Sequence, residues 1–122
     1  MSDFLPVLTT ARDVDGAKLA VHLGEIPNQE EVEKCLSILR PDRVGHATHL
    51  HPKTAGGSEK AMKLLDGAPV EICLTSNMWC RSVPSLEEHH VRHLHEDRPG
   101  FIFGQFPNYF FRMISMFYFG LD

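Results

Sequence analysis

The apolar and polar residues of the first hundred positions alternate between two patterns. Segments typical of short, buried parallel strands occur three times, at 18–23, 43–47 and 70–75. Segments in which apolar residues recur at helical spacing occur four times, at 3–12, 28–40, 58–66 and 86–97. This alternation of strand and helix predicts an α/β fold with right-handed crossovers and a parallel sheet.

Capping residues mark the ends of the expected helices. Asp3 and Ser58 are placed to cap the first and third helices, because their side chains can accept a backbone N–H. Asn28 precedes Glu31 by three residues, which is the spacing of a capping box, and Pro41 ends that helix. One face of the same helix is expected to be buried, through Val32, Cys35, Leu36 and Leu39.

The composition is that of one globular domain. Hydrophobic residues make up 43% of the 122 residues and charged residues 23%. The net charge of -4 gives no electrostatic reason to expect a nucleic-acid polymer as partner. Three cysteines and the lack of a basic stretch before an apolar run predict a reducing compartment and no secretory leader. We therefore expect a cytoplasmic protein.

The last 22 residues differ from the rest. Nine of the 11 aromatic residues lie in 101–122, which carries only two charges, Arg112 and Asp122. We therefore expect two parts, an α/β body at 1–100 and an atypical aromatic-rich tail at 101–122. Arg112 divides the tail into uncharged runs well short of the roughly 20 apolar residues that span a bilayer, so a spanning helix is not expected. A segment that lies in the membrane interface stays open as an alternative.

Polar residues collect where the predicted strands end. His22 and Glu25 follow the first strand, His46 ends the second, and Thr75, Ser76 and Asn77 end the third. The carboxyl ends of neighbouring parallel strands meet at one rim, so His22 and His46 should lie close together. A neutral histidine is a good zinc ligand, and a nearby carboxylate can transfer protons in metal-assisted hydrolysis. The spacing alone leaves open a core histidine and an ordinary loop carboxylate.

Four short sequence motifs favour the metal-site interpretation of these residues. They are HLGEIPNQ at 22–29, PDRVGHATHL at 41–50, EICLTSN at 71–77 and SVPSLEEHH at 82–90. In this order they resemble the adenosine deaminase family, in its adenosine deaminase-like branch, which deaminates N6-methyl-AMP to IMP and methylamine. The resemblance covers roughly residues 3–90.

The resemblance implies a fold, a cofactor and a set of roles. The fold would be part of a (β/α)₈ TIM barrel of the metal-dependent hydrolase type, roughly its fifth to seventh strands with their helices. Such a barrel holds one Zn²⁺ and takes a purine nucleotide as substrate. His22 would be a zinc ligand, Glu25 the proton donor, and His46 the residue that orients and deprotonates the zinc-bound water. Gly24 would let the substrate ring approach the backbone.

The chain also departs from the family. A complete barrel takes about 250 residues. The family's His-x-His zinc pair has no counterpart here, and its Asp-Asp pair is replaced by Phe-Gly-Gln-Phe at 103–106. Only one of four zinc ligands is thus matched. Two alternatives to an active deaminase stay open: an inactive truncated isoform or gene-model fragment, and an interaction module that docks through its aromatic tail. Open sheet edges would favour self-association.

Two further groups of histidines resemble metal-binding clusters. One comprises His46, His49 and His51, and the other comprises His89, His90, His93 and His95. We expect His49 and His51 to be surface histidines and the second group to lie on a solvated helix face. Cys35 and Cys73 are expected in the core, where cysteine packs as a small apolar residue.

Overall fold

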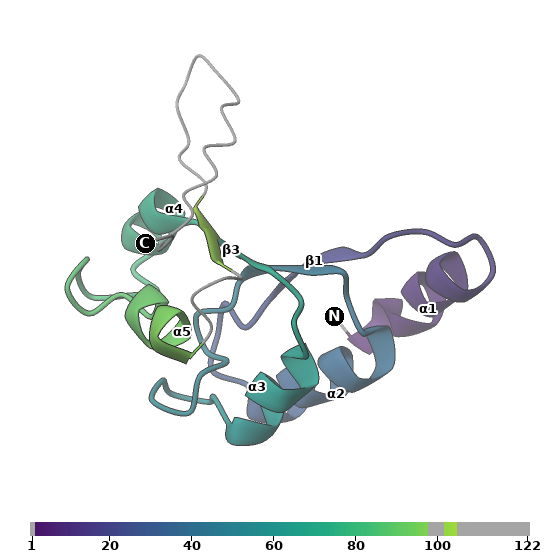
Figure 1. Ribbon diagram of the computed structural model, residues 1–122, viewed down its shortest axis with the longest axis horizontal. Coiled ribbons are helices and arrows are strands. Elements are labelled where there is room, and N and C mark those ends of the chain that lie inside the picture. Colours follow the sequence, from purple (N-terminus) through teal and green to yellow (C-terminus); the bar gives the residue numbers. More distant parts are fainter. Residues whose placement is uncertain (1, 98–101, 105–122) are drawn as a thin grey trace, which may run out of the picture.

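The computed structural model describes residues 2–97 and 102–104 (Figure 1). The elements follow in the order η1 (Ser2–Phe4), α1 (Leu5–Asp13), β1 (Ala20–Leu23), α2 (Gln29–Leu39), β2 (Arg43–His46), α3 (Glu59–Leu65), β3 (Val70–Ile72), α4 (Leu74–Trp79), α5 (Val91–Asp97) and β4 (Ile102–Gly104). The strands form one sheet in the order β1-β2-β3-β4, and every neighbouring pair is parallel. The predicted α/β class and parallel sheet are confirmed.

The two best-marked helix starts behave as the sequence predicts. The Asn28 side chain accepts the backbone N–H of Glu31 at 3.2 Å, and Ser58 Oγ accepts that of Ala61 at 3.0 Å. Such caps satisfy amides that have no partner inside the helix. The α2 helix ends at Leu39 because Arg40 turns into the left-handed region, with φ 43°, immediately before Pro41.

The first helix starts differently from the prediction. Asp3 lies in η1, and the residue that precedes α1 is Phe4, which has helical φ and ψ and makes no capping hydrogen bond from its side chain. The prediction that Asp3 caps this helix is therefore wrong. The 3-10 turn leads directly into α1, and Pro6 in the first turn has no N–H to be capped.

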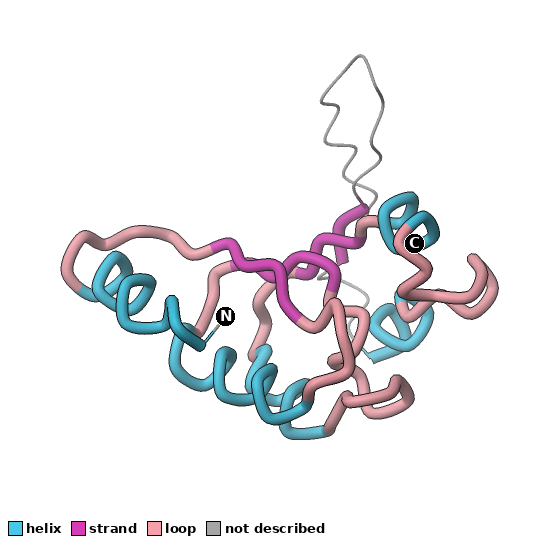
Figure 2. Tube along the Cα trace, turned by 180° about the vertical axis from the view of Figure 1, so that it is seen from behind, coloured by secondary structure: helices cyan, strands magenta, loops and turns pink. Residues whose placement is uncertain are grey.

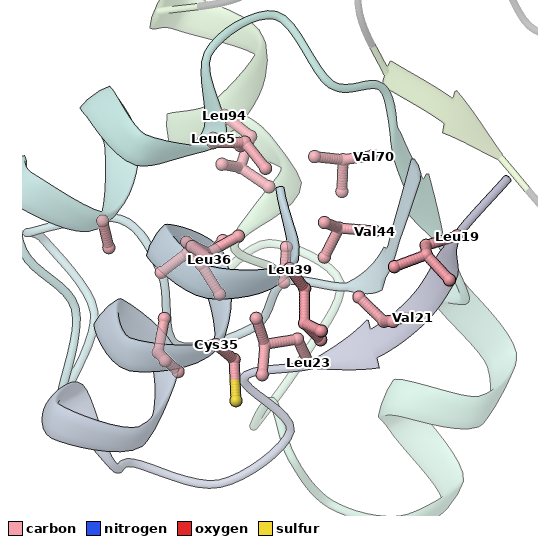
Figure 3. Packing of buried hydrophobic residues seen from close by; sticks show 14 of the residues in the cluster. Leu19, Val21, Leu23, Cys35, Leu36, Leu39, Val44, Leu65, Val70 and Leu94 are labelled. Atoms are coloured by element: carbon pink, nitrogen blue, oxygen red, sulfur yellow. The ribbon is translucent and has the colours of Figure 1, made fainter. Parts of the chain in front are cut away.

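The core lies between the sheet and the helices packed on it (Figure 3). Figures 1 and 2 show α1, α2 and α3 along the same side of the strands. The four residues of the predicted α2 face are all buried, and Leu36 and Leu39 are fully so. They pack with Val44 of β2 and Leu94 of α5. Burial of each such side chain stabilises the fold by about 1.5–3 kcal/mol.

Two boundaries differ by three residues or more from those predicted. The third strand ends at Ile72 instead of 75, and α4 starts at once, with Asn77 N–H donating to the Cys73 carbonyl at 2.8 Å. The last helix begins at Val91 instead of 86, and the residues before it form turns. Short polar segments next to strands satisfy helical and turn geometry equally well, so periodicity does not separate them.

The sheet ends at two strands with one partner each in the described part of the chain. These are β1 and β4. β4 falls at the point where the composition changes, and the rest of the predicted aromatic tail, 101 and 105–122, lies outside the described residues. Among the helices that are described, none has the length and apolar character needed to cross a bilayer.

Candidate active site

The register of β1 on β2 brings the two rim histidines together. His22 lies opposite Gly45, and Leu23 lies opposite His46. The rings of His22 and His46 meet edge to face, with centroids 4.8 Å apart and an interplanar angle of 71°. The approach that parallel strand ends predict for these histidines is therefore present in the structure.

An unusual backbone directs His46 toward the rim. His46 and Ala47 both have left-handed φ values, 66° and 53°. Each such residue costs about 1–3 kcal/mol, and such strain is common at functional sites. The turn is fixed because the Ala47 N–H donates to the Leu23 carbonyl at 3.1 Å and because His90 Nε2 donates to the His46 carbonyl at 2.7 Å.

Two glycines make room for this arrangement. A Cβ on Gly45 would lie 2.6 Å from Cδ2 of His22, so the imidazole ring lies in the space that a side chain would fill. Gly24 has φ +70°, and a Cβ there would overlap Cδ1 of the buried Leu50. Sequence reasoning named Gly24 and missed Gly45. The Gly-His pair at the end of β2 was the available signal.

Glu25 completes the group. Its carboxylate Oε2 lies 3.8 Å from His46 Nε2, and its side chain is 56% exposed. One ligand atom from each of His22, Glu25 and His46 can be chosen so that all three lie within 4.8 Å of one another. Burial lowers the pKa of His46, Glu25 opposes that effect and His22 adds to it. His46 is therefore a neutral imidazole near pH 7 beside an accessible carboxylate.

A cavity of about 470 Å³ adjoins this group. Its lining includes Glu25 and His46 together with His49, Ser76 and Asn77. Its size lies within the roughly 300–1,000 Å³ of small-molecule pockets. Of the three polar residues predicted at the end of the third strand, Ser76 and Asn77 therefore reach the site, from helix α4 rather than from a strand end.

Asn77 is the buried polar residue of the site that sequence reasoning left without a role. It is 2% exposed, and its Nδ2 lies 3.2 Å from His46 Nδ1 and 3.3 Å from Thr48 Oγ1. The signal in the sequence was weak, because a run of polar residues after a strand is also an ordinary loop.

The donor atoms of His22, Glu25 and His46 suit a metal ion in kind. Imidazole nitrogen and carboxylate oxygen are zinc ligands, and a catalytic zinc takes three protein ligands and a water. The three residues form a candidate His/Glu metal site within the described residues. If Glu25 and His46 handle protons instead, His22 alone remains, which is too few ligands for a catalytic ion.

Three of the six other histidines are buried, and for these three the prediction of surface histidines is wrong. His51, His89 and His90 are only 3%, 1% and 2% exposed. His51 Nε2 lies 2.8 Å from the Asp97 carboxylate, and the His89 and His90 rings stack with centroids 4.2 Å apart. Burial lowers the pKa of His89 to about 4 and that of His90 to about 3. They are packing and hydrogen-bonding groups behind the rim.

Comparison with known proteins identifies relatives over most of the chain. The adenosine deaminase family model matches residues 1–103. The N6-methyl-AMP deaminase of Danio rerio is 42% identical over 92 residues, which are 75% of this chain and 26% of that protein. The adenosine deaminase-like protein of Drosophila melanogaster is 43% identical over 95 residues, 78% of this chain and 26% of that protein.

Solved structures show the same fold. The apo N6-methyl-AMP deaminase of Arabidopsis thaliana superposes with a TM-score of 0.66 at 34% identity, over 80% of this chain and 27% of that one. An adenine deaminase from Arthrobacter aurescens, at 19% identity and TM-score 0.67, covers 85% of this chain and 30% of its own, and supports the fold alone.

The architecture is that of a segment of the adenosine deaminase-type TIM barrel. The chain spans about a quarter of the length of the curated relatives that it matches. With the family model covering 1–103, the chain belongs to the adenosine deaminase family.

Proposed function

We propose that this chain carries the proton-donating and water-orienting residues of a metal-dependent adenine-nucleotide deaminase. The reaction of that enzyme converts N6-methyl-AMP and water to IMP and methylamine. One observation supports it above all: His22, Glu25 and His46 lie within 4.8 Å of one another at the carboxyl ends of two parallel strands. Relatives named N6-methyl-AMP deaminase, and related structures complexed with IMP and GMP, support the substrate class.

Each residue has a role that follows from its position. Glu25, in a partly exposed loop beside the cavity, protonates the purine ring nitrogen next to the carbon under attack. Protonation makes that carbon electrophilic, so water oxygen can add and methylamine can leave. His46, held 3.8 Å from Glu25, orients the attacking oxygen. The backbone at Gly24 leaves space for the flat ring.

His22 is the residue that would hold the metal. Zinc, when bound, supplies a hydroxide at neutral pH. The ring of His22 lies over Gly45 and is exposed, so a ring nitrogen can bind an ion. We propose a cytoplasmic location with this function, because Cys35, Cys73 and Cys80 are thiols and not disulfides, as in reducing compartments.

The number of metal ligands supports a second proposal, that the isolated chain is inactive. With Glu25 donating a proton and His46 orienting the water, the described residues leave His22 as the one ligand of the metal, where about three are needed. We therefore propose that the 122-residue chain is inactive by itself. Its chemistry requires ligands from further polypeptide that completes the barrel rim.

A segment exchange tests both statements. Residues 1–100 of this chain would replace the matching segment of the Danio rerio relative, and zinc content and methylamine release from N6-methyl-AMP would be measured. We expect a zinc-dependent deaminase, and no turnover by the isolated chain. A folded, zinc-loaded exchange protein without turnover would contradict the proposed function, and turnover by the isolated chain would contradict the ligand count.

A further inference from the structure

The amide of Asn77 meets the inner nitrogen of His46. Nδ2 of Asn77 lies 3.2 Å from His46 Nδ1, 3.3 Å from Thr48 Oγ1 and 3.1 Å from Ser82 Oγ. Its Oδ1 is buried and has no hydrogen-bond partner among the described residues. Residues 46 and 77 are 31 positions apart, so the contact links the end of β2 to helix α4.

The orientation of this amide decides where the proton of His46 lies. With Nδ2 toward His46, the amide donates one hydrogen to Nδ1, and Nδ1 must carry a lone pair instead of a proton. The reversed amide would place two N–H donors where Oδ1 now lies without a partner, which leaves more buried groups unsatisfied. In the reversed orientation Oδ1 would face Ser82. The Ser82 hydroxyl could not donate to it, because it already donates to the backbone carbonyl of Asn77 at 3.1 Å.

We infer that Asn77 is a positioning residue that fixes the tautomer of His46, with the proton on Nε2 and facing the Glu25 carboxylate. This inference deepens the proposed function and rests on it for its catalytic consequence. A ring that carries its proton on Nε2 presents an N–H donor on the side of Glu25, whose Oε2 lies 3.8 Å away, and can donate to a water oxygen in the adjoining cavity. It cannot accept a proton at that atom, so His46 orients the attacking water and does not deprotonate it.

The tautomer can be read without zinc and without substrate. Long-range ¹H–¹⁵N correlation spectra of the labelled, metal-free 122-residue chain distinguish a protonated ring nitrogen from an unprotonated one. A His46→Gln variant assigns the signals. We expect Nδ1 to be unprotonated and Nε2 to carry the proton. The opposite tautomer in the unaltered chain would overturn the inference, and this result needs no variant to fold.

A nearly isosteric variant supplies the matched test. Asn77→Asp replaces the donor with a carboxylate acceptor, which should draw the proton to Nδ1 and invert the tautomer. Ser82→Ala removes another neighbour of the same amide and should leave the His46 tautomer unchanged. If Asn77→Asp does not fold, Asn77→Ala should give a mixture of both tautomers. An unchanged spectrum in a folded Asp or Ala variant would overturn the inference.

The catalytic consequence has its own readout in the exchange protein. Asn77→Asp should lower kcat about ten- to a hundredfold, which is typical of losing a residue that orients a site group, and should change KM little. Because the spectra are recorded without metal or substrate, a failed deaminase assay with the expected tautomer would reject the proposed function alone. The wrong tautomer together with normal turnover would reject the role of Asn77 alone.

Discussion

Among the histidines whose rings lie close together, two pairs differ in almost every physical respect. The rim pair, His22 and His46, meets edge to face beside the carboxylate of Glu25 and a cavity. The buried pair, His89 and His90, stacks face to face with almost no exposure. In the sequence the second pair belongs to a group of histidines that resembles a metal-binding cluster. The structure favours the first, because a carboxylate and an accessible ring nitrogen accompany it.

The buried pair supports the rim from behind. His90 Nε2 donates to the carbonyl of His46, and His89 Nδ1 accepts the N–H of Val91 at the start of α5. Both rings are thus neutral and hold backbone groups. The difference shows that histidine density does not by itself indicate metal binding. What each ring nitrogen bonds to decides the role.

The largest predicted effect is a loss of folding stability at acid pH, which we expect from the buried pair. The pKa of His89 is about 4 and that of His90 about 3 in the folded chain, against the ordinary 6.5. The unfolded chain therefore binds more protons below pH 6.5. Stability is unaffected above that pH, falls as pH drops from 6.5 toward 4, and levels off near 3. The slope is about 1.4 kcal/mol per pH unit for each histidine.

Denaturant unfolding of the chain between pH 7.5 and 4 measures this slope. Removing the titrating group, with His89→Gln, should reduce the slope by about 1.4 kcal/mol per pH unit, whatever the variant does to stability at neutral pH. An equally steep fall in that variant would mean that His89 does not contribute to the acid sensitivity.

A smaller effect compares two glycines of nearly equal backbone geometry. Gly24 at the rim has φ +70° and Gly16 in a turn has φ +67°, but only at Gly24 would a Cβ meet a neighbour, the buried Leu50. We expect Gly16→Ala to cost about 1–2 kcal/mol from the left-handed backbone alone. Gly24→Ala should cost about 1–3 kcal/mol more, because of overpacking. Equal losses in chemical denaturation would show that Leu50 moves away freely.

The smallest effect concerns the position of His22. A Cβ on Gly45 would lie 2.6 Å from Cδ2 and 2.9 Å from Nε2 of this exposed ring, which can swing aside. Gly45→Ala should therefore change stability little and weaken zinc binding by the exchange protein about ten- to a hundredfold. Gly67→Ala, where no atom lies within 4 Å of the added Cβ, should leave zinc affinity unchanged. Equal affinities in the two variants would show that His22 does not hold the metal.

Much of the fold could be predicted because helix caps and the spacing of apolar residues are local sequence patterns. Asn28 and Ser58 cap the helices that follow them, and the apolar face of α2 is buried as its spacing requires. The meeting of His22 and His46 also followed, since adjacent parallel strands end at the same rim. These are short-range or topological rules, and one sequence is enough to apply them.

The parts that could not be predicted depend on long-range contacts. The burial of His89 and His90 follows from packing under the β2 turn, including the bond from His90 to the carbonyl of His46, 44 residues away. The role of Gly45 requires the register that sets it opposite His22. The contact between Asn77 and His46 requires helix α4, which periodicity reads as loop. No local pattern carries this information.

The most direct test of the central claim is methylamine release from N6-methyl-AMP by the zinc-loaded exchange protein carrying Glu25→Gln, beside the same protein carrying His89→Gln. The first variant keeps the size of the side chain but replaces the carboxyl group with an amide, which cannot transfer a proton to the substrate. Turnover should therefore fall about 10²–10⁴-fold with zinc retained. The second should turn over normally at neutral pH. Undiminished turnover in Glu25→Gln, or an equal loss in both variants, would contradict the assignment of the chemistry to the rim.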